Sequence, residues 1–574
     1  MLSRLIAGAL APLVLAACTA GTAARPVASL PPRQTFAAGM VSAADPRAAE
    51  AGAEMLRAGG SATDAALATL LALTVVEPQS SGIGGGGFLV VDDGKGRLET
   101  IDGREKAPAA ATPEWFFSEG KPLGFPQAVP GGRSVGVPGN LALMAKAHAG
   151  HGKLAWSALF QPAIRLARDG WAQTPRNVDF LIGARETGAL SAEARAIYYA
   201  ADGAPLPAGT SIKNPALAVF LERLAKEGPQ AFYRGENAAQ IAAAVSTSPR
   251  NPAPMTRADV GAYQAKPRPP VCTFYRKHRI CGMGPPSSGA TTVQGVLGLL
   301  ERFDMKALGK DSPVAWHLIA EAQRLTYADR ERYLADPDFV AVPVAGLLAP
   351  DYIAARAQLI ALDRAMPSVA PGNPAGVKTA LADGLQVAEQ GTSHFVAIDR
   401  WGEAATLTST IESSFGSGLM VNGYYLNNEL TDLSLIPSRD GAPVANRVEG
   451  GKRPRSSMAP TLVYGPDGKL RLAVGAAGGT TIPAQVLKAI IAVIDWDLSA
   501  QDALALPVIF APGGDTVYVE RGSSHEALIP ALKAMGHSDV RIRGASFKAN
   551  AIEVVGGQLR GAADPRSDGA SISQ

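Results

Sequence analysis

The sequence has few cysteines, few histidines and almost no net charge. It contains 3 cysteines and 7 histidines in 574 residues, and its 54 basic and 51 acidic residues leave a net charge of +3. A nucleic-acid-binding protein concentrates positive charge on one face, so this small and evenly spread charge excludes a nucleic-acid partner. Apart from His148 and His151, the histidines lack the spacing of common metal ligands. We therefore expect no metal, no zinc hydrolase chemistry and no cofactor.

The sequence also lacks a long Pro/Ser-rich linker or a run of like charges that would divide it into separate domains. With 47% hydrophobic and 18% charged residues, it has the composition of an ordinary globular protein. Length alone would suggest roughly three or four domains, but without linkers we expect one extended core or two closely packed lobes.

The first residues carry a short apolar segment. Arg4 precedes the apolar residues 5–15, which are too few to form a stable membrane span and are typical of a secretory signal. The segment ends in Leu-Ala-Ala-Cys at Cys18, which resembles the lipobox of bacterial lipoproteins. An ordinary cleavage site with an incidental cysteine is the alternative, and both readings predict export. We expect a signal peptide over 1–17 and a periplasmic protein whose lipidated Cys18 anchors it to a bacterial membrane.

The other two cysteines, Cys272 and Cys281, flank the sequence TFYRKHRI. A hairpin centred between Arg276 and Lys277 would place them opposite each other on two strands, where an oxidising compartment could join them. Two reduced core cysteines are the alternative. We expect the disulfide, because one pair left after a lipobox suits a periplasmic protein.

The pattern of apolar residues predicts helices in the first two-thirds of the chain and strands in the last third. Asp45-Pro46 begins a helix over 47–58, and Ser61 with Asp64 forms a capping box before a nearly all-apolar helix over 65–76. Further helices are expected over 291–303, 318–336 and 484–496, and strands over 88–93, 393–399, 403–411, 461–465 and 470–474. The order predicts an α+β layered sandwich.

Two motifs suggest functions that their surroundings contradict. The Gly-rich stretch SSGIGGGGF follows a helix and precedes a strand, the reverse of a dinucleotide-binding fingerprint, so we expect close backbone packing against a site instead. Gly132 to Gly136 match the Gly-x-Ser-x-Gly elbow of α/β-hydrolases around Ser134, but Val137-Pro138-Gly139 interrupts the helix that the elbow requires. We expect a surface turn at Ser134.

Thr392 is the stronger candidate nucleophile. It opens a predicted hairpin, and the register that places Asp399 opposite Glu403 places Thr392 opposite Thr410, with Cβ atoms about 5 Å apart. Glu412 continues the same face. A threonine at the head of a strand, preceded by flexible Gly391 and faced by a second hydroxyl, could act as an N-terminal nucleophile. The alternative is an ordinary strand threonine, and a one-residue register change would separate the pair.

Several long motifs resemble those of the γ-glutamyltransferase (γ-glutamyltranspeptidase) family, in order and at compatible spacing. They include GTSHFVAIDRWGEAATLTSTIESSFGSG, YYLNNELTDLS, GKRPRSSMAPTLV and VGAAGGTTI, with EPQSSGIGGGGF and DGREKAPAAAT in the N-terminal half. The resemblance extends from about Gly39 to the C-terminal ADPRSDGAS. It implies an N-terminal-nucleophile hydrolase with a four-layer αββα sandwich, whose precursor cuts itself between Gly391 and Thr392. A large subunit of residues 18–391 and a small subunit of residues 392–574 would then form an αβ heterodimer.

The resemblance also assigns roles to residues. Thr392 would be the nucleophile, Thr410 would orient its hydroxyl, and Gly478 and Gly479 would form the oxyanion hole, where a helix start marked by Pro483 offers free N–H groups. The donor's α-carboxylate would bind Arg104, whose guanidinium donates in a fork, together with Ser456 and Ser457. The donor's α-ammonium would bind the acidic residues Glu412, Glu429 and Asp432.

Four features depart from the family pattern. Ser393 stands where many members have a second threonine, and Glu412 where some have asparagine. Arg455 replaces the usual leucine of KRPLSSM and adds a cation beside the carboxylate site. The segment 433–451 is shorter than the active-site lid of some bacterial members and contains no aromatic residue. The sequence therefore does not predict how water or an acceptor reaches the site.

The resemblance implies a γ-glutamyltransferase or glutathione hydrolase. It would cleave γ-glutamyl donors such as glutathione through a γ-glutamyl–Thr392 ester, which water or an amino acid or peptide acceptor resolves. A glutaryl-type β-lactam (cephalosporin) acylase on the same scaffold is the first alternative, because fold does not determine substrate. A non-catalytic, lipid-anchored binding protein is the second, and the intact Thr392, Thr410 and Gly478-Gly479 argue against it.

Overall fold

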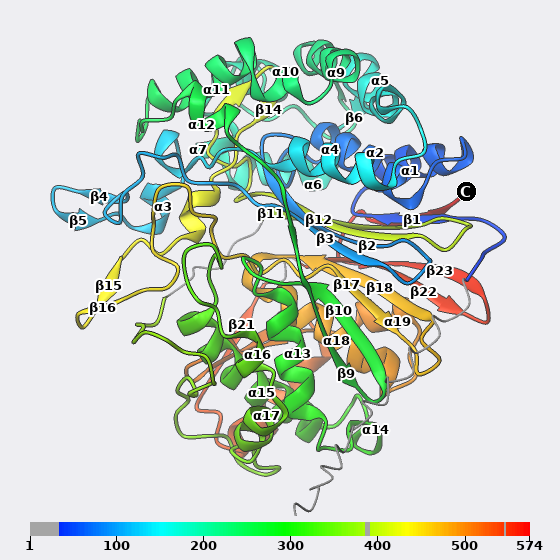
Figure 1. Ribbon diagram of the computed structural model, residues 1–574, viewed down its shortest axis with the longest axis vertical. Coiled ribbons are helices and arrows are strands. Elements are labelled where there is room, and N and C mark those ends of the chain that lie inside the picture. The colour runs from blue at the N-terminus through cyan, green and yellow to red at the C-terminus, as the bar shows by residue number, and fades with distance from the viewer. Residues whose placement is uncertain (1–33, 385–390, 545–546) are drawn as a thin grey trace, which may run out of the picture.

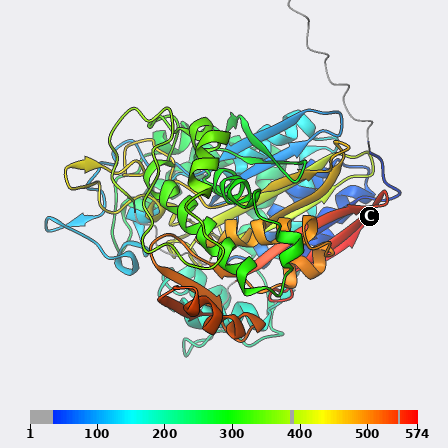
Figure 2. The ribbon, with the colours of Figure 1, turned by 90° about the horizontal axis from the view of Figure 1, so that it is seen from below.

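Two β-sheets lie face to face between layers of helices in the computed structural model, which describes residues 34–384, 391–544 and 547–574 (Figure 1). The predicted signal peptide and Cys18 lie outside the described residues. The arrangement is the expected α+β, αββα sandwich. Seen from below, the green and orange helices of one outer layer lie in front of the strands (Figure 2).

The first sheet has seven strands and the second has six. In spatial order the first contains β24 (Ala570–Ser573), β1 (Met40–Ala43), β11 (Gly391–Ile398), β12 (Ala404–Glu412), β2 (Gly86–Asp92), β3 (Leu98–Gly103) and β8 (Lys266–Arg268). The second contains β23 (Gln558–Ala563), β22 (Lys548–Val555), β18 (Leu470–Ala477), β17 (Thr461–Tyr464), β10 (His278–Met283) and β9 (Pro270–Tyr275). Both sheets therefore combine strands from the N-terminal and C-terminal parts of the chain.

Helices cover the outer face of each sheet. The first sheet is covered by α1 (Pro46–Arg57), α2 (Ala62–Val76), α4 (Asn140–His151) and α5 (Gln161–Asp169), and the second by α13 (Gly289–Leu300), α15 (Pro313–Tyr333), α18 (Ile482–Ile494) and α19 (Ala500–Ala505) (Figure 1). Beyond the first layer lie α6 (Pro175–Gly183), α8 (Ala192–Tyr198), α9 (Pro215–Glu227), α11 (Gly235–Ser246) and α12 (Arg257–Gly261). The C-terminal half of the chain also contains smaller elements: α16 (Val344–Leu347), α17 (Pro350–Ala357), β19 (Ile509–Phe510), β20 (Thr516–Glu520), α20 (Ile529–Ala534) and β21 (Asp539–Arg543).

The first two helices begin where the sequence predicted. The Asp45 side chain accepts a hydrogen bond from the Arg47 N–H, and the capping box of Ser61 and Asp64 is complete. Every residue of α2 is buried, because this helix lies between the first sheet and the helices outside it.

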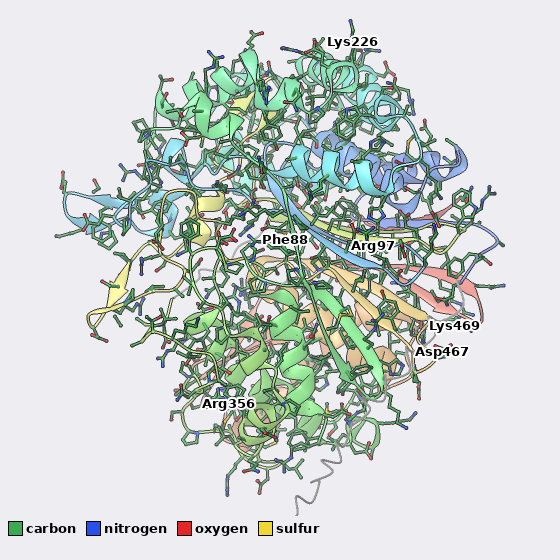
Figure 3. The ribbon with its side chains drawn as sticks, viewed as in Figure 1. Phe88, Arg97, Lys226, Arg356, Asp467 and Lys469 are labelled. Atoms are coloured by element: carbon green, nitrogen blue, oxygen red, sulfur yellow. A yellow bond between two sulfur atoms is a disulfide. The ribbon has the colours of Figure 1, made fainter. Side chains whose placement is uncertain are left out.

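Alternate residues of β11 serve different parts of the core. Phe395 and Ala397 pack with the helices of the first layer, whereas Val396 and Ile398 pack between the two sheets. Phe88 of β2 also packs there and lies in the middle of the molecule, while Lys226 and Asp467 lie at its periphery (Figure 3). His394, on the same face as Val396, packs against Gly475 of β18 in the second sheet.

The predicted cysteine hairpin is confirmed. Cys272 and Cys281 are directly opposed residues of β9 and β10, and a disulfide joins them. Arg276 and Lys277 form the turn with φ angles of 48° and 66°, the left-handed conformation that a two-residue hairpin turn requires. Among the described residues, no helix has both the length and the apolar character needed to cross a bilayer.

Candidate active site at the start of β11

The hairpin of β11 and β12 has the predicted register along most of its length and a bulge at its open end. Ser393 pairs with Ser409 and Ile398 with Ala404, as expected, but Gly391 pairs with Glu412 rather than with Ile411. Two residues of β12, Thr410 and Ile411, lie opposite the single residue Thr392 of β11, so the extra residue is on β12 and Thr392 has no regular ladder partner. Bulges redirect side chains, and here the bulge leaves the Thr392 and Thr410 oxygens 3.2 Å apart.

The Thr392 hydroxyl contacts the peptide bond that precedes it. It donates a hydrogen bond to the Gly391 carbonyl oxygen, and the Thr410 hydroxyl donates to the same oxygen at 2.8 Å. Both threonines are buried. The carbonyl carbon of Gly391 therefore lies beside the Thr392 hydroxyl, and a second hydroxyl, that of Thr410, polarises its oxygen.

Two glycines permit this close arrangement. A Cβ atom on Gly391 would lie 2.4 Å from the Glu412 carbonyl oxygen, and one on Gly85 would lie 1.9 Å from the Thr410 carbonyl oxygen. Any side chain at either position would displace the strand that carries Thr410. The expectation that the Gly-rich stretch packs closely against a site is thus confirmed at Gly85.

Gly478 and Gly479 lie at the end of β18, beside the start of β11. The His394 ring packs directly on Gly475 of β18. One residue earlier in β11, Ser393 Oγ lies 3.3 Å from Nζ of Lys548, which pairs with Ala477 of β18. Following β11 back towards Thr392 therefore follows β18 forward towards Gly478. Gly478 and Gly479 have φ angles of 122° and 58° and lead into η4 (Gly479–Thr481) and α18. The first N–H groups of a helix have no intrahelical acceptor, so this turn can serve as an oxyanion hole.

A group of buried carboxyl side chains surrounds Arg104. Its guanidinium forms ion pairs with Glu429 and Asp432, and its Nε donates to the Pro454 carbonyl oxygen at 3.2 Å. Glu105 and Glu412 complete the group, which we call the acidic cluster: Glu105, Glu412, Glu429 and Asp432. The Arg104 guanidinium, which was expected to bind a substrate carboxylate, thus contacts acidic side chains of this chain.

Burial raises the pKa of three members of the acidic cluster. Desolvation, with a smaller effect from Asp432, raises the pKa of Glu412 to about 8, and desolvation raises that of Glu105 to about 7. Desolvation also raises the pKa of Glu429 well above its ordinary value. Carboxyl oxygens of all three have no hydrogen-bond partner within the described part of the chain. A cationic group entering the cluster would satisfy these oxygens and favour their ionised form.

The two expected serines follow Pro454 and Arg455, whose carbonyl oxygens accept from Arg104, and they lie beside an arginine that the sequence analysis missed. Arg330 of α15 donates to Ser457 Oγ at 2.6 Å and to Ser288 Oγ at 2.8 Å, and Ser288 Oγ donates to the Ser456 carbonyl oxygen at 2.7 Å. Arg455, the departure from KRPLSSM, donates to Glu331 Oε2 at 2.6 Å. Burial and the Arg330 charge lower the pKa of Arg455 to about 10.

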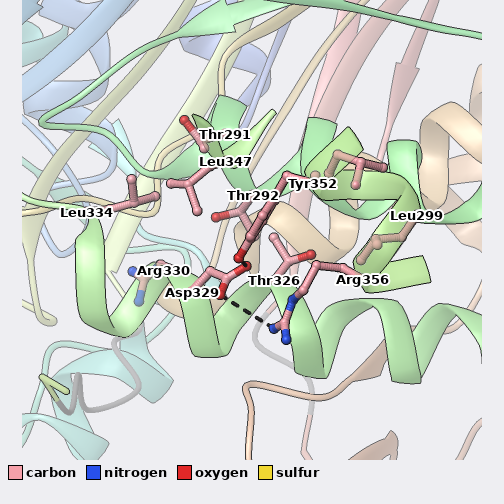
Figure 4. A pocket seen from close by; sticks show the side chains of 12 residues that line it. Thr291, Thr292, Leu299, Thr326, Asp329, Arg330, Leu334, Leu347, Tyr352 and Arg356 are labelled. Atoms are coloured by element: carbon pink, nitrogen blue, oxygen red, sulfur yellow. Dashed lines mark hydrogen bonds and ion pairs between the residues drawn. The ribbon is translucent and has the colours of Figure 1, made fainter. Parts of the chain in front are cut away.

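A small cavity of about 20 Å³ lies beside α15, next to Arg330 (Figure 4). Asp329 accepts from Tyr352 at 2.8 Å and from the Gly372 N–H at 2.6 Å, and it pairs with Arg356. A cavity of this size holds about one water molecule. These contacts fix the turn of α15 that carries Arg330.

The comparisons with known proteins decide the family. The sequence model described as γ-glutamyltranspeptidase matches residues 48–573. The chain belongs to the γ-glutamyltranspeptidase family. The two stacked sheets and their helices are accordingly the fold of an N-terminal-nucleophile hydrolase.

Relatives in the family are named for more than one activity. The chain is 37% identical over 548 residues to the glutathione hydrolase proenzyme of Bacillus subtilis (strain 168), covering 93% of this chain and 91% of that protein. It is 34% identical over 546 residues to the acylase ACY 1 proenzyme of Pseudomonas sp. (strain SE83), covering 93% of each. A solved structure of cephalosporin acylase from Bacillus halodurans has a TM-score of 0.82 and 27% identity, covering 94% of this chain and 96% of that chain.

Two further segments of the chain bear on the site. Ser134 lies in a buried 3-10 turn, not on the surface as expected, and its hydroxyl donates to the Val129 and Gly131 carbonyl oxygens at 2.6 and 3.0 Å. These bonds leave it no role as a nucleophile elbow. The short segment 433–451 forms a hairpin of β15 (Ser438–Arg439) and β16 (Ala442–Pro443) that projects from the molecule (Figure 1).

Sequence reasoning missed Glu105 and Arg330 for different reasons. Glu105 directly follows Arg104 in the motif DGREKAP, so that motif could have indicated it. Arg330 lies in ADRERY near the end of a helix, where charged residues usually face solvent. Only the burial of α15 brings it to Ser457.

Proposed function

We propose that this protein is a self-processing γ-glutamyltransferase and glutathione hydrolase with Thr392 as its nucleophile. Cleavage between Gly391 and Thr392 would give subunits of residues 18–391 and 392–574, which remain together as an αβ heterodimer. The arrangement of the Thr392 and Thr410 hydroxyls around the Gly391 carbonyl supports the processing step.

Processing proceeds by an acyl shift. The Thr392 hydroxyl adds to the Gly391 carbonyl carbon, the C–N bond breaks, and the Thr392 nitrogen receives the proton and the electron pair. Thr410 stabilises the oxyanion by the hydrogen bond that it donates to the carbonyl oxygen. Water then hydrolyses the ester, which leaves the Gly391 carboxylate and a free α-amine on Thr392.

The freed amine then acts as the base in turnover. Its reference pKa is about 8, so it can accept the Thr392 hydroxyl proton near neutral pH without a histidine. The hydroxyl attacks the γ-carbonyl of the donor, N–H groups at Gly478 and Gly479 stabilise the oxyanion, and the leaving amine takes the proton. Water or the amine of an acceptor resolves the γ-glutamyl ester.

The acidic cluster around Arg104 is the observation that carries the γ-glutamyl assignment. A γ-glutamyl group ends in an α-carboxylate and an α-ammonium, so it can exchange partners with the Arg104–Asp432 ion pair without adding net charge. The carboxylate would take Arg104, Ser456 and Ser457, and the ammonium would take Asp432, Glu429 and Glu412. A glutaryl group brings a negative charge alone, which these carboxyl groups disfavour.

A cavity of about 430 Å³ beside the oxyanion turn suits the leaving group or the acceptor. Thr480, which follows Gly479, lies in its wall, with Tyr327, Phe510, Tyr518 and Arg543. The aromatic rings would contact an apolar side chain, and Arg543 would attract the carboxylate of an amino acid or peptide.

One purified sample tests both parts of the proposal. Intact mass should find two chains that meet at Gly391 and Thr392, and γ-glutamyl anilide should be cleaved faster than glutaryl anilide. Thr392→Ala should remain uncut and inactive. A wild-type protein that stays one chain yet hydrolyses either anilide would refute the processing mechanism, and a preference for glutaryl anilide would favour the acylase.

A further inference from the structure

A buried ion pair lies beside the nucleophile without a part in the reaction described above. Lys548 Nζ is 2.9 and 3.0 Å from the two carboxylate oxygens of Glu77. Both side chains are buried, with about 5% or less of their surface exposed. Glu77 follows α2 in the helix layer, and Lys548 begins β22 of the second sheet, so the pair connects two layers of the sandwich.

The ion pair holds Ser393, the residue that follows Thr392. The Ser393 hydroxyl donates to Glu77 Oε2 at 2.5 Å, and Lys548 Nζ lies 3.3 Å from Ser393 Oγ. Lys548 Nζ also lies 3.3 Å from Ser80 Oγ, and the Ser80 carbonyl oxygen accepts from the Ile411 N–H, next to Thr410. The same group of side chains therefore contacts both strands that carry the threonines.

Stability is a weak explanation for this pair. A carboxylate at the C-terminal end of a helix faces the negative end of the helix dipole, which disfavours it. Replacing a buried ion pair by apolar residues is often neutral or stabilising. Burial opposes ionisation of Glu77, yet Lys548 and Ser393 hold its pKa below the ordinary value, so the carboxylate is charged at neutral pH.

The bulge explains why such an anchor matters. Thr392 lies opposite the bulge, and Ser393 is the first residue after it that pairs regularly with β12. Once the bond to Gly391 is cut, Thr392 has no covalent attachment on its N-terminal side. The orientation of its amine and hydroxyl then depends on the position of Ser393.

We propose that Glu77 and Lys548 are positioning residues that hold Ser393, and through it the Thr392 amine and hydroxyl, in the geometry for processing and turnover. The turnover part rests on the proposed γ-glutamyl activity, whereas the processing part needs no substrate. Misplacing a reacting group by about 1 Å can lower a rate by about a hundredfold. Loss of the anchor should therefore lower kcat and the processing rate while KM changes little.

The test compares variants of the full-length protein by the rate of chain cleavage on a gel and by kcat and KM for γ-glutamyl anilide. Lys548→Met and Ser393→Ala should each lower the cleavage rate and kcat by about tenfold or more, with KM within about twofold. Ser393→Thr keeps the hydroxyl and should retain wild-type rates.

Lys488→Met is the matched control. Lys488 is also buried, and its Nζ donates to the Leu504 and Leu506 carbonyl oxygens at 2.9 and 2.7 Å, away from the nucleophile. This variant should lower the melting temperature but leave the rates unchanged.

Three results would decide the matter. If Lys548→Met and Ser393→Ala melt earlier but process and turn over at wild-type rates, the pair is only structural and the proposal is wrong. If Lys548→Met does not fold, the cleavage rate and kcat of Ser393→Ala compared with those of Ser393→Thr still test whether the hydroxyl at position 393 positions Thr392. If the wild type cleaves itself but has no γ-glutamyl activity, the proposed function fails while the cleavage rates still test the anchor.

Discussion

Replacing Asp432 by asparagine should separate γ-glutamyl from glutaryl substrates. Asp432 is buried and pairs with Arg104, and its side chain is one of the charges expected to face the donor's α-ammonium. Asparagine keeps the size of the side chain and removes its charge. The variant should therefore lose affinity for a donor that carries an ammonium and retain affinity for one that carries a carboxylate alone.

The magnitude follows from the burial of the site. Removing one partner of a buried, hydrogen-bonded charge pair costs about 2–5 kcal/mol. At about 1.4 kcal/mol per factor of ten, kcat/KM for γ-glutamyl anilide should fall by about thirtyfold or more. Glutaryl anilide should be cleaved at an unchanged or higher rate, because one negative charge has left the acidic cluster and Arg104 has lost a competing partner.

The assay measures kcat/KM for both anilides in the wild type and the variant at one pH. Asp495→Asn serves as the control, because Asp495 is also buried and pairs with Arg276, on the outer side of the second sheet. The control should change both substrates alike and only slightly. Equal losses on both anilides in Asp432→Asn would refute the assignment of Asp432 to the ammonium.

Three further predictions concern stability and location. The folded protein keeps a proton on Glu412 between the ordinary pKa of 4.5 and about 8, so stability falls as pH rises through this window; Glu412→Gln should raise the melting temperature more at pH 8 than at pH 5. Replacing Cys272 and Cys281 by serine should cost about 2–3 kcal/mol in urea unfolding through loop entropy, and unreduced wild type should show no free thiol at either position. Cys18→Ser should move the protein from the membrane fraction to the soluble periplasm, and equal solubility of both forms would contradict lipidation.

Features set by neighbours in the chain could be read from the sequence. The capping box of Ser61, the turn at Arg276 and Lys277, and the register of β11 against β12 each depend on a few adjacent residues and on the alternation of a strand. The resemblance to the family then predicted roles for residues far apart in the chain, because several long motifs in a constant order identify a family without any knowledge of contacts.

Contacts between distant segments depended on the packing of the sandwich. The bulge opposite Thr392 comes from one extra residue in β12, and no periodic pattern marks it. Arg104 meets Glu429 and Asp432 across more than 300 residues of chain, and Glu77 meets Lys548 across 471. Such pairs form only when sheets and helices stack, since burial and charge balance select partners in space. Periodicity predicted the layers, and their stacking determined which charged side chains lie beside Thr392.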